Sequence, residues 1–304
     1  MKVKWISLLL LIVVVCALAA CETMQPVVNV GTALGVASGT ISQGQADSIS
    51  RSAQAVGKTF EDITPEQEYY IGRAVAATVL SQYRAYDLAE LNHYVNVVGQ
   101  TLAQASNRPQ TFGGYHFQVI DSPEINAFAA PGGLILVTRG MLRCCKTEDA
   151  LAAVLAHEIA HVQNQDGLRA IKTSRLTSAL TLIAVEGAKQ YVGAELAQLT
   201  QAFEGSVGDI VNTMVTSGYS RELERQADET AITILRRVGY NPYALVDMLT
   251  VMKSQLKPGG AGFAKTHPDP QERISSIQTL AGGPGKTPPP AARQARFERA
   301  LGAV

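Results

Sequence analysis

Two histidines and a glutamate in the segment His157-Glu158-Ile159-Ala160-His161 have the spacing of a metal-binding and proton-transfer site. An apolar run from Ala150 to Val162 contains this segment and predicts a helix, so the two imidazoles share one helix face and can bind one metal ion. Glu158 lies beside them, placed to take a proton from the attacking water. The chain has only five histidines, so the pattern rarely arises by chance. It predicts a zinc-dependent peptidase.

A third metal ligand is expected in the acidic segment from Ser220 to Asp228, because catalytic zinc usually has three protein ligands. Glu224 and Asp228 are one helical turn apart, so we expect Glu224 to reach the metal. Asp228 is then placed to accept a hydrogen bond from the outer nitrogen of a ligand histidine. The alternative is a solvated helix face, paired with the arginines of the same segment. The fallback ligands are Glu222, Asp228 and Glu229.

Length and charge limit the class of protein. The 304 residues, 46% of them hydrophobic, suffice for one sizeable domain with appendages or for two small domains. The formal charge is +0, from 26 basic and 26 acidic residues, so nothing indicates nucleic acid as a partner.

The N-terminus has the pattern of an export signal. Lys2 and Lys4 precede an unbroken apolar run from residue 5 to 17, which is short for a membrane span. The following Leu-Ala-Ala-Cys resembles a bacterial lipobox, which implies that Cys21 is acylated and holds the mature protein to a membrane. Glu22 favours sorting to the outer membrane. The alternatives are an ordinary signal peptide or an uncleaved anchor.

The remaining cysteines do not indicate a disulfide-stapled fold. Cys16 leaves with the signal, so Cys144 and Cys145 are the remaining thiols. Adjacent cysteines can pair with each other only in a strained ring. We expect two small packed side chains, with a redox role as the alternative.

Periodicity predicts an α+β protein that is mostly helical. Thr64-Pro65-Glu66-Gln67 is a helix start with a capping box. Strand-like segments at 115–120 and 133–138 flank an extended piece at 126–132 that turns at Pro-Gly. The helices are expected at 64–83, 88–105, 150–162, 168–216, 221–238, 242–256, 270–280 and 291–301. The apolar stretch at 176–185 could be core, a lid or a membrane-surface helix.

Four segments in order resemble one family of peptidases. They are Asn126-Ala-Phe-Ala-Ala-Pro-Gly-Gly133, the H-E-x-x-H segment, Glu224-Arg-Gln-Ala-Asp228, and Thr266-His-Pro-Asp-Pro270 with Arg273. The combination resembles the gluzincin zinc endopeptidases that include the CAAX prenyl proteases and the HtpX-type proteases. It is similar in particular to their periplasmic lipoprotein members of the BepA and LoiP kind. The resemblance covers residues 65 to 280 and implies a zincin-like domain with a small antiparallel sheet beside the H-E-x-x-H helix.

The resemblance also implies a role for each matched residue. His157, His161 and Glu224 would bind one zinc ion per chain, Glu158 would be general base and proton donor, and Asp228 would support a ligand. An extended substrate would pair with a strand edge at the side of the cleft. The residues of that edge are Asn126, Ala127, Phe128, Ala129, Gly132 and Gly133.

His267 has three possible roles. It could be a removable fourth ligand that keeps the enzyme latent, it could stabilise the oxyanion with Arg273 nearby, or it could belong to a helix-start turn. His93 and His116 have no partner pattern and are expected to be core or surface residues.

The sequence therefore predicts a lipid-anchored periplasmic zinc endopeptidase that cleaves misfolded or envelope proteins. The expected organisation is a signal peptide at 1–20, a tether at 21–58, the peptidase domain at 59–282, and a Gly/Pro-rich linker with a short helix at 283–304. The first alternative is a lipid-anchored chaperone that binds clients without cleaving them, and the second is a purely structural zinc site. No feature indicates the oligomeric state.

Overall fold

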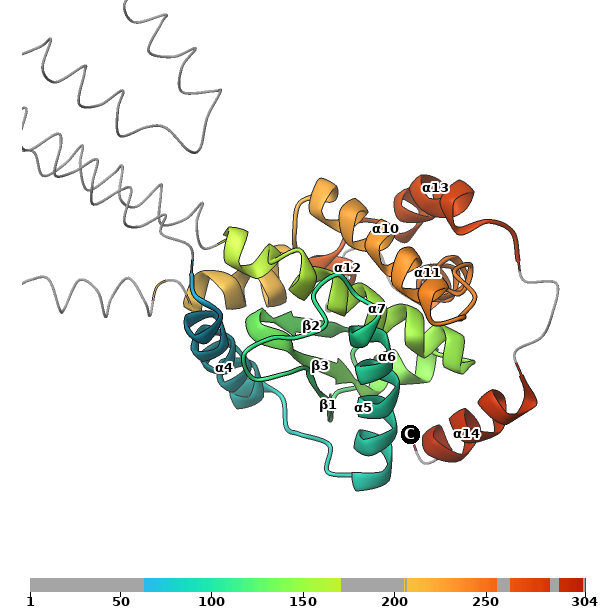
Figure 1. Ribbon diagram of the computed structural model, residues 1–304, viewed down its shortest axis with the longest axis horizontal. Coiled ribbons are helices and arrows are strands. Elements are labelled where there is room, and N and C mark those ends of the chain that lie inside the picture. The colour runs from blue at the N-terminus through green and yellow to red at the C-terminus, as the bar shows by residue number, and fades with distance from the viewer. Residues whose placement is uncertain (1–62, 171–204, 206, 256–262, 285–289, 303) are drawn as a thin grey trace, which may run out of the picture. The chain divides into compact units, whose positions relative to one another are not determined.

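Helices surround one small sheet in the part of the chain that the computed structural model describes (Figure 1). The described residues are 63–170, 205, 207–255, 263–284, 290–302 and 304, and all belong to one unit. Within these residues the predicted α+β, mostly helical fold is confirmed. The expected signal peptide, tether and apolar stretch at 176–185 lie outside them. No described helix is long and apolar enough to cross a membrane.

The sheet has three strands in the order β1-β3-β2. β1 (His116–Ile120) is parallel to β3 (Leu134–Thr138), and β2 (Ala127–Ala130) is antiparallel to β3. The prediction of an antiparallel sheet was therefore wrong, because the sheet is mixed. The chain after β1 crosses to the far side of β3 before it forms β2. β2 is consequently an edge strand.

A tight turn joins β2 to β3. It is the short helix η1 (Pro131–Gly133), in which Gly132 has a φ of 77° and Gly133 a φ of 98°. These left-handed values favour glycine. The buried carboxylate of Glu68 accepts the backbone N–H of Gly132 at 3.0 Å and is paired with Arg108. The predicted turn at Pro-Gly is confirmed, and a buried ion pair fixes its position.

Helices cover both faces of the sheet. Their bounds are α4 (Pro65–Gln82), α5 (Ala89–Gln104), α6 (Arg139–Cys144), α7 (Glu148–Gln163), η2 (Thr213–Ser217), α10 (Arg221–Arg237), α11 (Ala244–Gln255), α12 (Phe263–Thr266), α13 (Pro270–Ala281) and α14 (Ala291–Leu301). The predicted helices in the described ranges are confirmed to within two residues at most ends. The capping box at Thr64 and Gln67 is also present. α6, α12 and the π-helical turn η2 were not expected.

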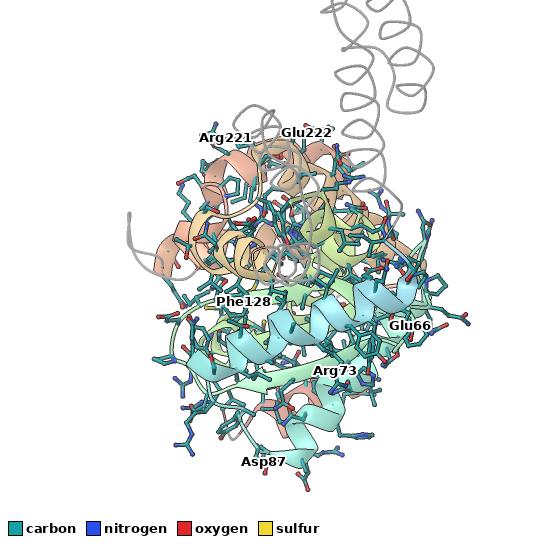
Figure 2. The ribbon with its side chains drawn as sticks, turned by 90° about the vertical axis from the view of Figure 1, so that its left-hand side faces the viewer. Glu66, Arg73, Asp87, Phe128, Arg221 and Glu222 are labelled. Atoms are coloured by element: carbon teal, nitrogen blue, oxygen red, sulfur yellow. The ribbon has the colours of Figure 1, made fainter. Side chains whose placement is uncertain are left out.

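Side chains alternate between two apolar clusters along the strands. On β3, Ile135 and Val137 face the larger cluster, which includes residues of α5, α7, α10 and α11. Leu136 faces the smaller cluster, which includes the buried side of α4. Figure 2 shows Phe128 of β2 behind α4, whose Glu66 and Arg73 lie toward solvent. Because successive side chains of a strand point to opposite faces, the sheet lies between these two helical layers.

α7 is the central helix of the larger cluster. Its N-cap Thr147 accepts the N–H of Ala150, and every residue from Glu148 to Val162 is buried. α10 packs along α7, and alanines on both helices are fully buried, which permits a close approach. A hydrophobic helix buried on all sides holds its polar side chains in fixed positions.

α14 packs onto the start of α7. Phe297 is 5% exposed and belongs to the larger cluster. Arg296 forms an ion pair with Glu148, whose carboxylate also accepts the hydroxyls of Tyr94 and Tyr240, both at 2.7 Å. The short C-terminal helix predicted from sequence is therefore part of the domain core.

Replacing Phe297 tests this docking. The Phe297→Ala variant should lower the free energy of unfolding by about 3 kcal/mol, because a buried aromatic ring leaves a cavity. The measurement is urea unfolding of the full-length protein. The control is Arg299→Ala on the exposed side of the same helix, which should unfold like the wild type. Equal midpoints for the two variants would show that α14 contributes nothing to the core.

Candidate metal centre

Four side chains direct possible ligand atoms at one point. They belong to His157, His161, Glu224 and His267, and one nitrogen or oxygen from each lies within 4.8 Å of the others. The side chains of His157, His161 and Glu224 are 4%, 2% and 1% exposed. Such burial of ionisable groups is costly unless a partner satisfies them. Within the described residues, the structure thus brings together the three ligands expected from sequence and His267.

α7 and α10 position three of these side chains. His157 and His161 are one turn apart on α7, and the planes of their rings are 85° apart. α10 begins after Ser220, whose side chain accepts the N–H of Leu223. Glu224 lies in the first turn of α10, on the face that packs against α7. Two well-capped helices therefore hold the donors from opposite sides.

The acidic segment of α10 has two faces. Arg225 pairs with Glu222 and Glu229 on the exposed face, as expected of neighbours three and four residues apart. Glu224 and Asp228 are on the buried face. The solvated-face interpretation is therefore correct for Glu222 and Glu229 and not for Glu224.

The spacing of the donor atoms fits a tetrahedral metal ion. The His157 and His161 Nε2 atoms are 3.2 Å apart, and Glu224 oxygens lie 3.5 Å from the first and 3.6 Å from the second. His267 Nε2 is 3.7 Å from Glu224 Oε1. Donors about 2.0–2.1 Å from a common tetrahedral centre are about 3.4 Å apart, as in zinc sites with nitrogen and oxygen ligands.

The hydrogen bonding within the cluster also fits a cation. Both carboxylate oxygens of Glu224 are buried without a hydrogen-bond partner among the described residues. The outer nitrogens of His157 and His161 lie against carboxylates, so the inner nitrogens face each other at 3.2 Å, a separation that suits a shared cation or proton. Burial and Arg273 lower the pKa of His157, but the carboxylates of Asp228 and Glu224 raise it more, to about 9. Metal binding has to displace that proton.

Asp228 holds His157 from behind. Its Oδ1 is 3.0 Å from His157 Nδ1, which is the contact expected from sequence. Arg273 donates two hydrogen bonds to the same carboxylate, at 2.9 and 2.6 Å. Burial raises the pKa of Asp228, but Arg273 and His157 outweigh it and bring the value to about 2. Arg273 Nη1 lies 3.7 Å from Glu224 and is buried without a hydrogen-bond partner.

Asp166 holds His161 in the same way, and sequence reasoning missed it. Asp166 is 0% exposed, and its Oδ2 is 2.8 Å from His161 Nδ1. α7 ends one turn earlier, and Gln165 has a φ of 55°, the single positive value of a non-glycine residue in the described chain. This left-handed residue turns the backbone so that Asp166 lies beside His161. A spacing of five residues is not a helical neighbour, so the turn alone creates the contact.

Tyr219 and Phe263 are two further side chains that the motifs did not indicate. The ring of Tyr219 stacks on His161 with centroids 4.6 Å apart, and its hydroxyl is buried without a hydrogen-bond partner among the described residues. The ring of Phe263 stacks on His267 at 3.9 Å. Burial lowers the pKa of His267 more than Glu224 raises it, to about 3. The imidazole of His267 is therefore neutral, as a metal ligand requires.

Glu158 lies next to the first histidine and is 3% exposed. Burial raises the pKa of its carboxyl group above the ordinary value, although the neighbouring imidazoles oppose the shift. A general base works best when its pKa is near the working pH. Its environment therefore suits proton transfer.

The segment from Asn126 to Gly133 lies against α7, the helix that carries the two histidines. Ala127 to Ala130 are the edge strand β2, which lies against α7 and η2. The backbone of Asn126 pairs with that of Thr138, and Asn126 is 1% exposed. The free side of an edge strand can accept another extended chain.

The remaining histidines and cysteines lie outside the cluster. His93 and His116 are exposed, and His116 bonds to the carbonyl of Gly113. Cys144 and Cys145 are buried free thiols, and burial raises the pKa of both. Their environment is that of packed side chains.

Comparison with known proteins identifies the family. The model of peptidase family M48 matches residues 89–281. The chain belongs to this family. M48 peptidases are zinc metallopeptidases, so the predicted enzyme class and the predicted zinc cofactor are confirmed at the level of the family. The matched region includes α5 to α13 and all four converging side chains.

Relatives come from bacteria and mitochondria. The chain is 28% identical to the beta-barrel assembly-enhancing protease of Escherichia coli over 193 residues, which are 63% of this chain and 39% of that protein. It is 28% identical to the mitochondrial metalloendopeptidase OMA1 of Schizosaccharomyces pombe, over 73% of this chain and 63% of that protein. It is 24% identical to the metalloprotease YcaL of Escherichia coli, over 54% and 61%. This chain thus spans less than half of the first relative.

Asp166→Asn tests the contact behind His161. The substitution removes the negative charge but keeps the size, so zinc affinity should fall about 10- to 100-fold, as is usual for partners of ligand histidines. The measurement is chelator competition on the full-length protein. The matched control is Asp149→Asn, a buried carboxylate at the other end of α7 that is paired with Arg293. An unchanged zinc affinity in both variants would contradict a supporting role for Asp166.

Proposed function

We propose that this chain is a zinc metalloendopeptidase that hydrolyses peptide bonds of misfolded or envelope proteins at the cluster on α7 and α10. One observation carries the proposal. Two buried imidazoles and one buried carboxylate face a single point, and Glu158 lies directly beside them. The two oxygens of that carboxylate, Glu224, have no hydrogen-bond partner among the described residues. In this assignment His157, His161 and Glu224 are the zinc ligands. A purely structural site has no need of a proton acceptor at that position.

The reaction is hydrolysis, in which Glu158 moves the proton. When bound, zinc supplies a Lewis acid that polarises the scissile carbonyl and acidifies water. The carboxylate of Glu158 takes the proton from the attacking water and later delivers it to the leaving nitrogen. Arg273 is held by Asp228 and has a free donor directed toward Glu224, so it can stabilise negative charge that develops beside the cluster.

The substrate is expected to bind as an extended strand. β2 is an edge strand that packs against α7, which carries His157 and His161, so its outer side can pair with the substrate backbone. The residues offered for this pairing are Asn126, Ala127, Phe128, Ala129, Gly132 and Gly133. Hydrogen bonds to the substrate backbone depend little on the side chains of the substrate. This mode of binding therefore suits an enzyme that removes unfolded chains of many sequences.

Cys21 and the relatives support a place in the cell envelope. The lipobox-like segment ending at Cys21 supports a lipid anchor on the periplasmic side of a membrane, and Glu22 favours the outer membrane. The Escherichia coli relative is named for enhancing beta-barrel assembly. By analogy, we assign this chain to envelope protein quality control. The proposed organisation is a signal peptide at 1–20, a tether at 21–58 and a peptidase domain at 59–282, onto which α14 of the C-terminal segment 283–304 packs.

Glu158→Gln tests the proposed function. The variant should bind one zinc ion per chain but lose cleavage of casein by at least about 100-fold, because general base catalysis contributes that much or more. The measurement is casein degradation together with zinc content. The His157→Ala variant should lose both zinc binding and casein cleavage. If Glu158→Gln cleaves casein like the wild type, the assignment is wrong. If neither the wild type nor a variant without His267 cleaves any unfolded substrate, a client-binding chaperone becomes the better description.

His267 is proposed to be the removable fourth ligand. Its Nε2 lies within the same 4.8 Å group as the other donors, and its Nδ1 is 3.0 Å from the hydroxyl of Thr266. A fourth protein ligand fills the position that catalysis needs for water. The resting enzyme would then be latent.

His267→Ala separates this role from the oxyanion role. Removing a blocking ligand should increase casein cleavage several-fold while the protein still binds one zinc ion. The measurements are initial cleavage rate and zinc content, with the exposed His93→Ala as the matched control. Slower cleavage with zinc retained would instead assign His267 to transition-state stabilisation.

A further inference from the structure

Three aromatic side chains form an exposed patch where α4 begins. Phe112 and Tyr70 are 56% and 54% exposed, the highest values among the large hydrophobic side chains of the described residues. Tyr69 lies between them, and its ring centroid is 5.3 Å from that of Tyr70 and 5.5 Å from that of Phe112. Single hydrophobic side chains on a surface are ordinary, but a contiguous group that is this exposed indicates an interaction surface. We call these three residues the aromatic patch.

The fold holds the aromatic patch in place. Phe112 belongs to the loop between α5 and β1, and Arg108 of that loop is paired with the buried carboxylate of Glu68 on α4. The ring of Tyr69 lies directly on the backbone of Gly113, where a Cβ atom would come within 2.2 Å of the ring. The rings are therefore ordered before any partner binds, which lowers the entropic cost of docking.

Polar groups at the edge of the aromatic patch suit a boundary between water and lipid. Arg73 donates to the hydroxyl of Tyr69 at 3.0 Å, and its guanidinium lies 5.6 Å from the centroid of that ring. Figure 2 shows Arg73 and Glu66 on the solvent side of α4, about one turn after and before the two tyrosines. Aromatic rings with hydroxyl and guanidinium groups at their rim are typical of side chains at the headgroup level of a membrane.

The aromatic patch lies where the chain from the proposed lipid anchor enters the domain. α4 begins at Pro65 and is the first helix or strand after Cys21 in the part of the chain that the structure describes. Tyr69 and Tyr70 are in its second turn. An anchor in a bilayer keeps this surface at a high effective concentration near lipid, so that even a weak contact with the lipid is populated.

We propose that the aromatic patch docks on the phospholipid bilayer that holds the lipid of Cys21, with the rings of Tyr70 and Phe112 among the headgroups. The inference rests on the lipid anchor of the proposed function and adds a second membrane contact. A single attachment through a tether leaves the domain free to rotate. The second contact turns the start of α4 and the loop before β1 toward the lipid.

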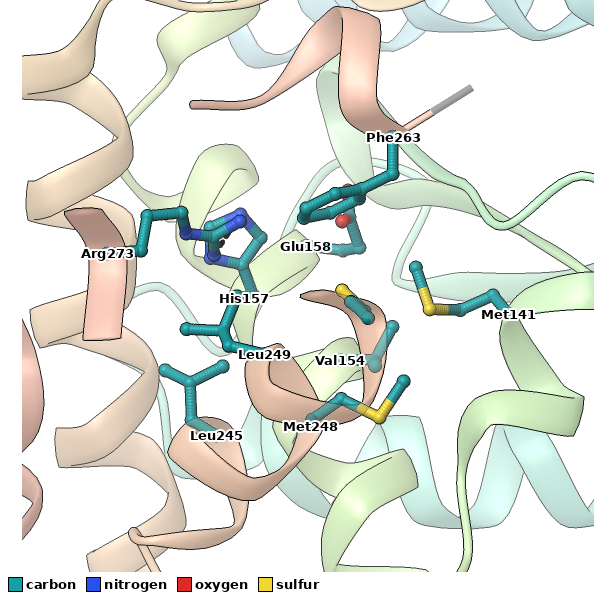
Figure 3. A pocket seen from close by; sticks show the side chains of 10 residues that line it. Met141, Val154, His157, Glu158, Leu245, Met248, Leu249, Phe263 and Arg273 are labelled. Atoms are coloured by element: carbon teal, nitrogen blue, oxygen red, sulfur yellow. Dashed lines mark hydrogen bonds between the residues drawn. The ribbon is translucent and has the colours of Figure 1, made fainter. Parts of the chain in front are cut away.

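The aromatic patch is separate from the side chains proposed for catalysis. Figure 3 shows the surroundings of Glu158, whose side chains belong to α6, α7, α11, α12 and α13. None of the side chains drawn there belongs to α4 or to the loop between α5 and β1. Substitutions in the patch can therefore test docking without altering the proposed zinc site.

Fluorescence quenching by lipid tests the docking. Trp5 is the single tryptophan of the chain, so Phe112→Trp together with Trp5→Phe places one fluorophore in the aromatic patch. The lipidated protein is reconstituted into vesicles of phosphatidylethanolamine and phosphatidylglycerol whose acyl chains carry bromine near the headgroup. The introduced tryptophan should be quenched, because bromine quenches only at close contact. The matched controls Val97→Trp on α5 and Leu280→Trp on α13 replace exposed side chains outside the patch and should keep their fluorescence.

Removing one ring tests whether the aromatic patch makes the contact. Adding Tyr70→Ser to the Phe112→Trp protein should lower the ratio of docked to free domains about threefold, because less apolar area is buried against lipid. The matched control Leu80→Ser removes an exposed apolar side chain near the other end of α4 and should leave that ratio unchanged. Zinc content and the urea midpoint should be those of the wild type in both variants.

The outcomes separate this inference from the proposed function. Protein that floats with the vesicles while its tryptophan at position 112 stays unquenched overturns the docking, and the lipid anchor and the endopeptidase assignment stand. Protein that does not float contradicts the lipid anchor and removes the docking with it. A blue shift on adding casein, without quenching by lipid, would assign the patch to protein substrates and overturn the inference. Quenching by lipid in a protein that cleaves nothing, even as His267→Ala, supports the docking and removes the endopeptidase assignment.

Discussion

Buried ligand atoms that repel one another are held together between α7 and α10. Two imidazole nitrogens 3.2 Å apart and a carboxylate without hydrogen-bond partners lie in a region almost closed to water. Such an arrangement is stable only if a cation compensates it. The surrounding structure provides the positions for that cation. Alanine-rich contact between the helices brings the donors close, and carboxylates behind both histidines orient the rings.

The two histidines are supported differently. Asp228 shares its charge between His157 and the buried Arg273, whereas the described cationic partner of Asp166 is Arg169, at 3.5 Å with a side chain that is 54% exposed. Asp228 and Arg273 therefore belong to a buried network that also stabilises the fold, because loss of either partner leaves an unpaired charge. Asp166 has a more local effect, since the turn at Gln165 holds it against a single ring. A substitution behind His161 can therefore change metal affinity with less effect on folding stability than a substitution behind His157.

Helical periodicity and capping accounted for much of the fold and for the convergence of the proposed ligands. The positions of His157, His161, Glu224 and Asp228 follow from spacing of three to four residues on two strongly patterned helices. The mixed sheet did not follow, because strand order depends on where the segment between β1 and β2 crosses, and local sequence does not encode this. The contact of Asp166 with His161 did not follow either, because it depends on a left-handed backbone conformation at Gln165. Phe263 and α14 reach the site and the core through contacts between residues far apart in sequence, which no local pattern reveals.

The central proposal is that zinc is bound by nitrogen and oxygen from α7 and α10. X-ray absorption at the zinc edge of the full-length protein measures this most directly. We predict one zinc ion per chain, with nitrogen and oxygen neighbours only, at about 2.0–2.1 Å. Those neighbours should be lost in Glu224→Ala and His161→Ala. A sulfur neighbour at about 2.3 Å, or an unchanged spectrum in both variants, would place the metal elsewhere and contradict the proposal.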